Sequence, residues 1–274
     1  MERRRERLLQ IIRLGQPMTV RQVFYQATVH GVVDKAESGY TKVQTDLVIM
    51  RRSGQLPYSW ITDNTRFQRK PRSFDGIHQA LEETARFYRK DLWASADTYV
   101  EVWLEKDALS GVIYPVTAEY DVPLMVARGY ASLSFLHSAA DYINDLNVPT
   151  FIYHLGDYDP SGVNAGEKIK ETLRELAPDA DITFQRIAVQ PEQIAAWGLP
   201  TRLTKTTDTR SKGFSDISVE LDAIEPNRLR SLVRSAIEQH LPEDQLDILK
   251  AAEESERQTL TWWAKAIAEQ GGSA

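Results

Sequence analysis

The sequence predicts an α/β protein in which an N-terminal helical domain precedes a Rossmann-like, mainly parallel sheet and C-terminal helices. Two observations lead to this fold class. Residues 1–90 contain stretches with helical periodicity, and from Asp97 onward short apolar runs alternate with helical stretches. Such alternation is typical of βαβ units, whose strands run parallel. We therefore expect two domains, 1–90 and 91–274.

Three helices and a small hairpin are expected in the first domain. An apolar stripe between Leu8 and Leu14 predicts the first helix, and Thr19 is a suitable N-cap for the second. The predicted elements are helices over Arg4–Leu14, Val20–Val29 and Thr41–Ser53, then strands over Leu56–Ile61 and around Phe67. This pattern is typical of a winged-helix domain, in which the third helix enters a DNA groove.

The second domain contains four runs that favour strands. They are rich in β-branched and aromatic residues, and helical stretches separate them. The predicted strands are Tyr99–Leu104, Val122–Ala127, Thr150–Leu155 and Asp181–Val189, and the predicted helices are Phe74–Arg89, Asp107–Tyr120, Ala131–Leu146, Ser161–Leu176 and most of Pro226–Ala268. Trp262 and Trp263 are expected to pack on the body of the protein. The polar segment Leu203–Asp216 is expected to be a mobile loop.

The charge is divided unevenly along the chain. The 274 residues carry a net charge of −6, which by itself argues against a nucleic-acid partner. Residues 1–90, however, contain 17 Lys and Arg against 9 Asp and Glu, a net charge of +8, and the remainder has a net charge of −14. Such a split indicates a polyanion-binding domain joined to an acidic one. Chance and solvated helix faces are the alternative explanation.

The composition excludes several classes of protein. There is no Cys, so disulfides, thiolate metal sites and Cys nucleophiles are absent. No apolar run approaches the roughly 20 residues that span a bilayer, and the basic N-terminus does not lead into a signal-peptide core. We expect no membrane association and a cytoplasmic location.

Carboxylates follow two of the predicted strands. Glu105 comes directly after one, and Asp157 and Asp159 follow another in the run Gly156-Asp157-Tyr158-Asp159-Pro160-Ser161-Gly162. Ligands bind beyond the carboxyl ends of parallel strands, so these three side chains are expected to converge there. Crowded carboxylates favour a hard divalent cation, Mg²⁺ above all. The alternative is that Asp157 caps a helix and Asp159 belongs to a turn.

The acidic run and an earlier motif together resemble a known family. Glu105 followed by the Asp157–Gly162 run resembles the Toprim domain, and Glu105-Lys106-Asp107-Ala108 and Arg128-Gly129-Tyr130 narrow the likeness. The chain is similar to the A subunit of topoisomerase VI and to the meiotic double-strand-break transesterases. In these proteins a winged-helix domain with a Thr-x-Arg-x-x-(Phe/Tyr)-Tyr motif precedes the Toprim domain, and Thr19–Tyr25 matches that motif.

The resemblance implies a Mg²⁺-dependent enzyme that cleaves duplex DNA as a homodimer. Tyr25 resembles the nucleophile that forms a 5′-phosphotyrosyl link, and Arg21, one helical turn earlier, would steady the phosphate. Glu105, Asp157 and Asp159 resemble the Mg²⁺ ligands, and Lys106 resembles a phosphate contact. In the family, the tyrosine of one subunit meets the metal of the other. A phenol, whose pKa is ordinarily about 10, needs such help to attack.

Basic residues of the first domain are expected to line the duplex. The candidates follow the third predicted helix and the predicted hairpin, where they would contact phosphates without reading sequence. They are Arg51, Arg52, Arg66, Arg69 and Lys70. Arginines at a helix C-terminus also suit the helix dipole, which is a structural explanation for Arg51 and Arg52.

Two other functions fit the same residues. A Toprim nuclease would activate water directly and leave Tyr25 as a core residue. A DNA-binding scaffold would keep the fold without catalysis. The chain is shorter than the usual A subunit and has no ATPase region, so it resembles a compact, bacterial-type, standalone member whose ATPase partner, where one exists, is a separate B-like subunit.

Overall fold

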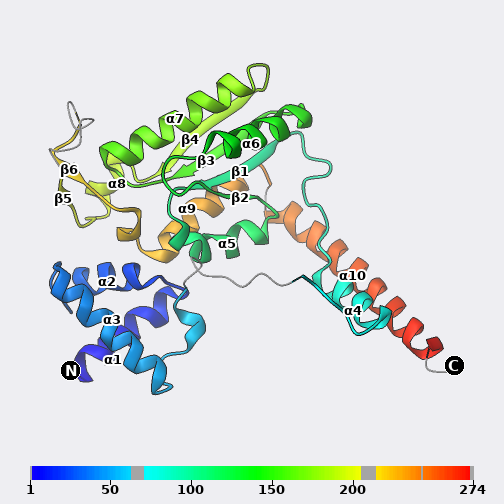
Figure 1. Cartoon of the computed structure of the whole chain (residues 1–274), viewed down its shortest axis with the longest axis horizontal. Helices are drawn as coiled ribbons and strands as arrows, with labels where there is room; N and C mark the ends of the chain where they lie inside the picture. Colours follow the sequence, from blue (N-terminus) through cyan, green and yellow to red (C-terminus); the bar gives the residue numbers. More distant parts are fainter. Residues whose placement is uncertain (1, 63–70, 205–213, 242, 272–274) are drawn as a thin grey trace. The chain divides into compact units, whose positions relative to one another are not determined.

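The computed structural model describes residues 2–62, 71–204, 214–241 and 243–271. The chain forms two compact units, and each combines segments that are distant in the sequence (Figure 1). The first unit contains residues 1–66 and 97–237, and the second contains residues 67–96 and 238–274. The boundary expected after residue 90 therefore lies inside the second unit.

A parallel four-stranded sheet forms the centre of the first unit. Its strands are β1 (Tyr99–Leu104), β2 (Leu124–Val126), β3 (Thr150–Leu155) and β4 (Ile182–Ala188), in the order β2-β1-β3-β4. The expected parallel α/β sheet is thus confirmed. Because β1 and β3 pair in register from Tyr99 with Thr150 to Leu104 with Leu155, their carboxyl ends lie side by side.

Helices cover both faces of this sheet (Figure 1). They are α5 (Ser110–Glu119) and α9 (Pro226–Glu238) on one face, and α6 (Leu133–Leu146) and α7 (Pro160–Leu176) on the other. The core beneath α6 and α7 contains Trp103, Ile143, Ile152, Ile169 and Leu173, all almost fully buried. These apolar positions recur every three or four residues in the helices, which explains why they pack on the sheet.

Three helices precede the sheet, close to their predicted positions. They are α1 (Glu2–Gly15), α2 (Val20–Val29) and α3 (Glu37–Arg52). Thr19 caps α2, because its side chain accepts a hydrogen bond from the backbone of Gln22 and the side chain of Gln22 returns one to Thr19. The carboxylate of Asp46, which is buried on α3, accepts hydrogen bonds from both Arg4 and Arg5. Part of the positive charge of residues 1–90 is therefore paired with a buried carboxylate inside the protein.

The strand expected over Leu56–Ile61 is wrong. Residues Tyr58–Trp60 form a short 3-10 helix, η1, which begins after Pro57. Proline fixes φ near −65° and favours such a turn over a strand. Ile61 makes an isolated parallel bridge to Met18. The second expected strand, around Phe67, lies outside the described residues, so the hairpin of a winged helix is not confirmed.

The second unit is a pair of packed helices, α4 (Ile77–Phe87) and α10 (Glu243–Gly271). Polar contacts join them: Tyr88 and Lys90 both donate hydrogen bonds to Glu256, and the backbone of Lys90 donates to Glu253. The expectation that Trp262 and Trp263 pack on the body of the protein stays a prediction, because both residues belong to this second unit. Their side chains are 62% and 55% exposed and contact each other edge to face.

Short elements complete the first unit. They are η2 (Asp107–Leu109), α8 (Pro191–Ala196), the antiparallel pair β5 (Arg202–Leu203) and β6 (Ile217–Ser218), and η4 (Leu221–Ala223). Residues 205–213, most of the loop expected to be mobile, lie outside the described residues. Within the described ranges, no helix is both long enough and apolar enough to cross a membrane.

Candidate functional site

Two of the expected acidic residues meet at the carboxyl edge of the sheet. Glu105 follows β1 and Asp157 follows β3, and the pairing of these strands brings them together. The Oε2 atom of Glu105 accepts a hydrogen bond of 2.9 Å from the backbone nitrogen of Asp157. We call residues 156–162 the acidic turn. The backbone of the acidic turn therefore fixes the position of the Glu105 carboxylate.

Two glycines make room for this carboxylate. A Cβ atom added to Gly156 would lie 2.5 Å from Oε2 of Glu105, and one added to Gly162 would lie 3.0 Å from it. The added atom at Gly162 would also lie 2.6 Å from the backbone oxygen of Asp157. Glycine at both positions therefore allows the close approach that any larger side chain would prevent.

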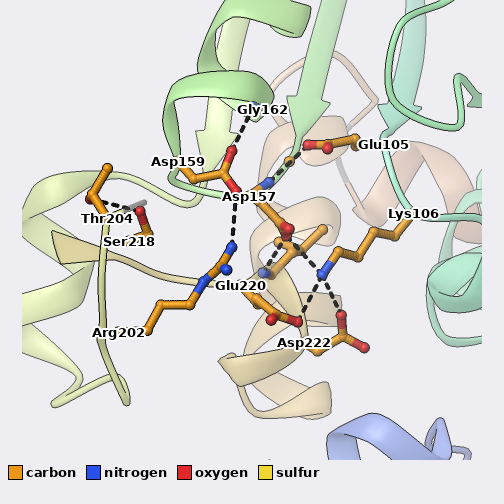
Figure 2. Close-up of polar contacts among 12 residues, drawn as sticks. Glu105, Lys106, Asp157, Asp159, Gly162, Arg202, Thr204, Ser218, Glu220 and Asp222 are labelled. Atoms are coloured by element: carbon orange, nitrogen blue, oxygen red, sulfur yellow. Dashed lines mark hydrogen bonds and ion pairs between the residues drawn. The ribbon is translucent and has the colours of Figure 1, made fainter. Parts of the chain in front are cut away.

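Asp159 does not point toward Glu105 and Asp157. Its Oδ1 atom accepts a hydrogen bond of 2.8 Å from the backbone of Gly162 and caps α7, and its Oδ2 atom lies 3.0 Å from Nη2 of Arg202 (Figure 2). The alternative expectation that Asp157 caps this helix is wrong, because Asp159 is the N-cap and Asp157 accepts a hydrogen bond from Leu221. No group of three or more His, Cys, Asp or Glu side chains suited to a metal ion occurs among the residues that the structure describes.

Glu105 and Asp157 nevertheless have the donor chemistry that Mg²⁺ requires. Burial and the neighbouring Asp157 raise the pKa of Glu105 to about 6. Burial likewise raises the pKa of Asp157, although Lys106 opposes this shift. Two buried carboxylates that disfavour each other's charge are stabilised by a divalent cation. Asp159 would have to leave Arg202 before it could join them.

A segment distant in sequence completes the site. Tyr158 and Val219 form an antiparallel bridge, and the backbone of Leu221 donates a hydrogen bond of 2.8 Å to Oδ1 of Asp157. We call residues 219–223 the bridging segment. It presents Glu220 and Asp222 beside the acidic turn, and its helix η4 also contacts α2. The segment thus connects the helix that carries Tyr25 to the edge of the sheet.

The ammonium group of Lys106 joins the acidic turn to the bridging segment. Its Nζ atom lies 3.0 Å from Asp157, 2.8 Å from Asp222 and 3.3 Å from Glu220 (Figure 2). Burial disfavours its charge, but the three carboxylates outweigh this effect and raise the pKa of Lys106. Lys106 is therefore a fixed cation next to the expected metal ligand Asp157.

Tyr25 lies at the other end of this network. Its side chain is only 5% exposed. Burial and the charge of Glu220 raise the pKa of Tyr25, and Arg21 and Lys106 partly offset that shift. Arg21, on the same face of α2, lies 3.6 Å from Glu220. Ion pairs thus join Arg21, Glu220, Lys106 and Asp157 in one network within a single chain, and the charges of this network act on the buried Tyr25.

Arg186 on β4 fixes the shape of the acidic turn. Its guanidinium donates hydrogen bonds to the backbone oxygens of Gly156, Asp157, Gly162 and Val189. Burial lowers the pKa of Arg186, and the carboxylates of Glu105 and Asp157 oppose that shift. Four backbone carbonyl groups thus accept hydrogen bonds from one side chain, which fixes the conformation of the turn.

His154, the last but one residue of β3, packs beneath the turn. It is 1% exposed and stacks on Phe184, and neither of its nitrogens has a hydrogen-bond partner among the described residues. Burial, followed by the charge of Arg186, lowers the pKa of His154 to about 3. His154 is consequently a neutral residue of the strand.

The candidate DNA-binding residues are only partly described. The guanidinium of Arg51 lies 4.9 Å from the ring centre of Tyr58 and donates a hydrogen bond to its backbone oxygen. Arg52 is exposed at the end of α3. Arg66, Arg69 and Lys70 lie outside the described residues.

Sequence reasoning missed four residues of the site: Glu220, Asp222, Arg202 and Arg186. The pair Glu220 and Asp222 has the same spacing as Asp157 and Asp159, which is the one local signal that could have indicated it. Arg186 is a charged residue inside a predicted strand, which often indicates a buried partner. Arg202 carries no such signal.

Comparison with known proteins does not extend these observations. No protein-family model and no curated protein sequence matches the chain.

Proposed function

We propose that the protein is a Mg²⁺-dependent DNA transesterase with a winged-helix domain and a Toprim domain, similar to the A subunit of topoisomerase VI. It would cleave duplex DNA through a 5′-phosphotyrosyl intermediate at Tyr25. One observation carries this proposal. Arg21, one helical turn before Tyr25, pairs with Glu220. Glu220 and Asp157 both pair with Lys106, so ion pairs join the helix of the candidate nucleophile to a candidate metal ligand.

Each member of the network has a role in this proposal. Arg21 and Lys106 are cations close to Tyr25 and would face the phosphate that it attacks. Glu105 and Asp157 would hold Mg²⁺, with Asp159 as a third ligand once released from Arg202. When bound, the cation would stabilise charge on the phosphodiester. Arg186 keeps the acidic turn in place through its four carbonyl contacts.

The partners follow from the same proposal. Arg51, Arg52, Arg66, Arg69 and Lys70 would bind the duplex backbone in the cytoplasm. A two-fold homodimer would place two sites on opposite strands of one duplex. Strand passage would need a separate ATPase subunit, whereas cleavage alone would not.

Two variants of the full-length protein test the proposal. Wild type, Tyr25→Phe and Asp157→Ala are incubated with supercoiled plasmid and Mg²⁺ and stopped with detergent. We expect wild type to retain DNA on protein in a protease-sensitive form, and both variants to retain none. Tyr114→Phe is the matched control, because Tyr114 is 61% exposed on α5. Cleavage by Tyr25→Phe at the wild-type rate would reject the proposal.

A Toprim nuclease is the second candidate, and the burial of Tyr25 favours it. A phenol that is 5% exposed, and whose pKa is raised mainly by burial, has the environment of a core residue. In a nuclease, water would attack DNA at Glu105 and Asp157. The same experiment would then show cleavage by Tyr25→Phe, no cleavage by Asp157→Ala, and no covalent adduct. Absence of cleavage in every sample, with DNA still bound, would indicate a binding scaffold.

A further inference from the structure

Arg202 holds Asp159 away from the other two carboxylates of the site. Its Nη2 atom lies 3.0 Å from Oδ2 of Asp159, while Oδ1 of Asp159 accepts the backbone hydrogen bond of Gly162 (Figure 2). Both oxygens of Asp159 are therefore engaged within the protein. As long as this ion pair lasts, Asp159 does not complete a set of three carboxylates with Glu105 and Asp157.

Backbone pairing places Arg202 beside the acidic turn. In β5 it pairs with Ser218 of β6, and the following residue, Val219, forms the bridge to Tyr158. The side chain of Arg202 is 35% exposed, so a ligand that arrives from solvent can reach it. Its Nε atom is buried and has no hydrogen-bond partner among the described residues. A guanidinium that turned from Asp159 to a phosphate could use Nε and Nη2 together, in the bidentate geometry that arginine favours.

A second cation lies next to Arg202. The exposed Lys35 donates a hydrogen bond of 2.6 Å from Nζ to the backbone oxygen of Thr201, and the same atom lies 5.7 Å from the ring centre of Tyr25. Burial lowers the pKa of Lys35, Glu220 opposes this shift, and the charge of Arg202 adds to it. Two neighbouring cations that repel each other attract an anion, and these two lie between the candidate nucleophile and Asp159.

We propose that Arg202, with Lys35 beside it, binds a phosphate of the DNA backbone and releases Asp159 as it does so, an inference that rests on the proposed function. The phosphate replaces the carboxylate as the partner of the guanidinium. The Oδ2 atom of Asp159 is then free to join Glu105 and Asp157 as a ligand of Mg²⁺. The binding of DNA and the binding of Mg²⁺ therefore favour each other, through one arginine that has two alternative partners.

The DNA half of the proposal is tested without metal. Full-length proteins bind a fluorescent duplex in EDTA, and anisotropy gives the Kd. Asp159→Asn frees Arg202 but keeps the helix cap, because asparagine also caps helices. We expect it to bind DNA about fivefold more tightly than wild type, the upper range for a partly exposed ion pair. Arg202→Met should bind more weakly than the matched control Arg174→Met, at an exposed position of α7.

The double variant of Asp159→Asn and Arg202→Met decides the cause of this gain. A general loss of negative charge would raise DNA affinity with or without Arg202, whereas the proposed exchange needs Arg202. We therefore expect the double variant to bind DNA no more tightly than Arg202→Met alone. A gain from Asp159→Asn that persists without Arg202, or no gain at all, would overturn the inference.

The metal half is tested without DNA, with Mn²⁺ as a substitute for Mg²⁺ that electron paramagnetic resonance detects. Arg202→Met leaves Asp159 free and should bind Mn²⁺ about fivefold more tightly than wild type, by the same ion-pair argument. The double variant should lack this gain, because its asparagine is a poorer ligand than a carboxylate. Equal Mn²⁺ affinities for wild type and Arg202→Met would contradict the competition for Asp159.

Failure of this inference and failure of the proposed function give different results. Wild type that binds the duplex and forms the covalent adduct, with Asp159 and Arg202 acting independently in both titrations, rejects only the role of Arg202. Wild type that binds no duplex rejects the proposed function and this role with it.

Discussion

The carboxylate of Glu105 lies in an environment that disfavours its charged form. Its Oε2 atom fits between two glycines and accepts a backbone hydrogen bond, yet burial and Asp157 raise its pKa to about 6 from the ordinary 4.5. Folding without a cation therefore costs free energy whenever Glu105 is ionised. This is the expected behaviour of a residue retained for function at the expense of stability.

The substitution Glu105→Gln tests this cost through pH. Below pH 4.5 the acid is protonated in both states, and above its folded pKa of about 6 it is ionised in both. The wild type therefore loses stability as pH rises between these values, by about 2 kcal/mol in total, and the amide does not. We expect the Gln variant to be more stable than wild type by about that amount at neutral pH, and equal to it in acid.

Urea unfolding with a chelator present measures the difference. Because Gln can still accept the hydrogen bond from Asp157, the contact itself is preserved. The control is Glu192→Gln, at an exposed position of α8. A Glu105→Gln variant less stable than wild type at neutral pH would contradict this account of Glu105.

Arg186 has the opposite character, because it stabilises the turn. Replacing it by Met would remove the guanidinium donor from the buried carbonyls of Gly156, Asp157 and Gly162, of which Gly156 keeps the hydrogen bond from the backbone of Val189. We expect a loss of about 3 kcal/mol in the free energy of unfolding. Arg174→Met, at an exposed position of α7, should change it by less than about 0.5 kcal/mol. Equal urea midpoints for the two variants would show that Arg186 is dispensable for the turn.

The regular elements were predictable because their signals are local. Strands β1 and β3 and helix α2 have the bounds expected from apolar runs and a capping threonine. The first strand of the expected hairpin was not predicted correctly, because aromatic residues that follow a proline are compatible with a 3-10 helix as well as with a strand. Glu220 and Arg186 could not be assigned to the site either. The position of Glu220 depends on the bridge between Tyr158 and Val219, and that of Arg186 depends on the pairing of β3 with β4. Both are tertiary contacts, which a local sequence pattern does not reveal.

The N-terminal cap of α2 stabilises the helix that carries Tyr25. Thr19 accepts the backbone hydrogen bond of Gln22, and its hydroxyl lies 3.5 Å from Asp222 of the bridging segment. We expect Thr19→Ala to lower the free energy of unfolding by about 1 kcal/mol through loss of the cap. Thr41→Ala, which removes only a hydroxyl bonded to its own helix, should have a smaller effect. Urea unfolding of both variants distinguishes these outcomes, and equal losses would contradict the role of the cap.

The uneven charge of the whole chain has a more specific meaning once the contacts are known. Arg4 and Arg5 neutralise a buried aspartate, so the positive charge of the first ninety residues is not all available to DNA. Arg21, in contrast, reaches Glu220 in the acidic part of the chain. The basic and acidic parts of the sequence therefore meet at the candidate site, where opposite charges alternate around Tyr25.

This meeting within one chain leads to a prediction about assembly. In the family that the sequence resembles, tyrosine and metal come from different subunits. Here Arg21, on the helix of Tyr25, is linked to Asp157 through ion pairs of Glu220 and Lys106 of the same chain. We expect each site to be complete within its own chain. Tyr25→Phe and Asp157→Ala proteins, inactive alone, should then stay inactive when mixed under conditions that exchange subunits. Wild type mixed with the double variant should still form the covalent adduct, which shows that mixed assemblies remain competent. Restoration of adduct formation in the first mixture would instead require that Tyr25 reaches the acidic turn of a partner, because only a site built from two chains could combine the two intact residues.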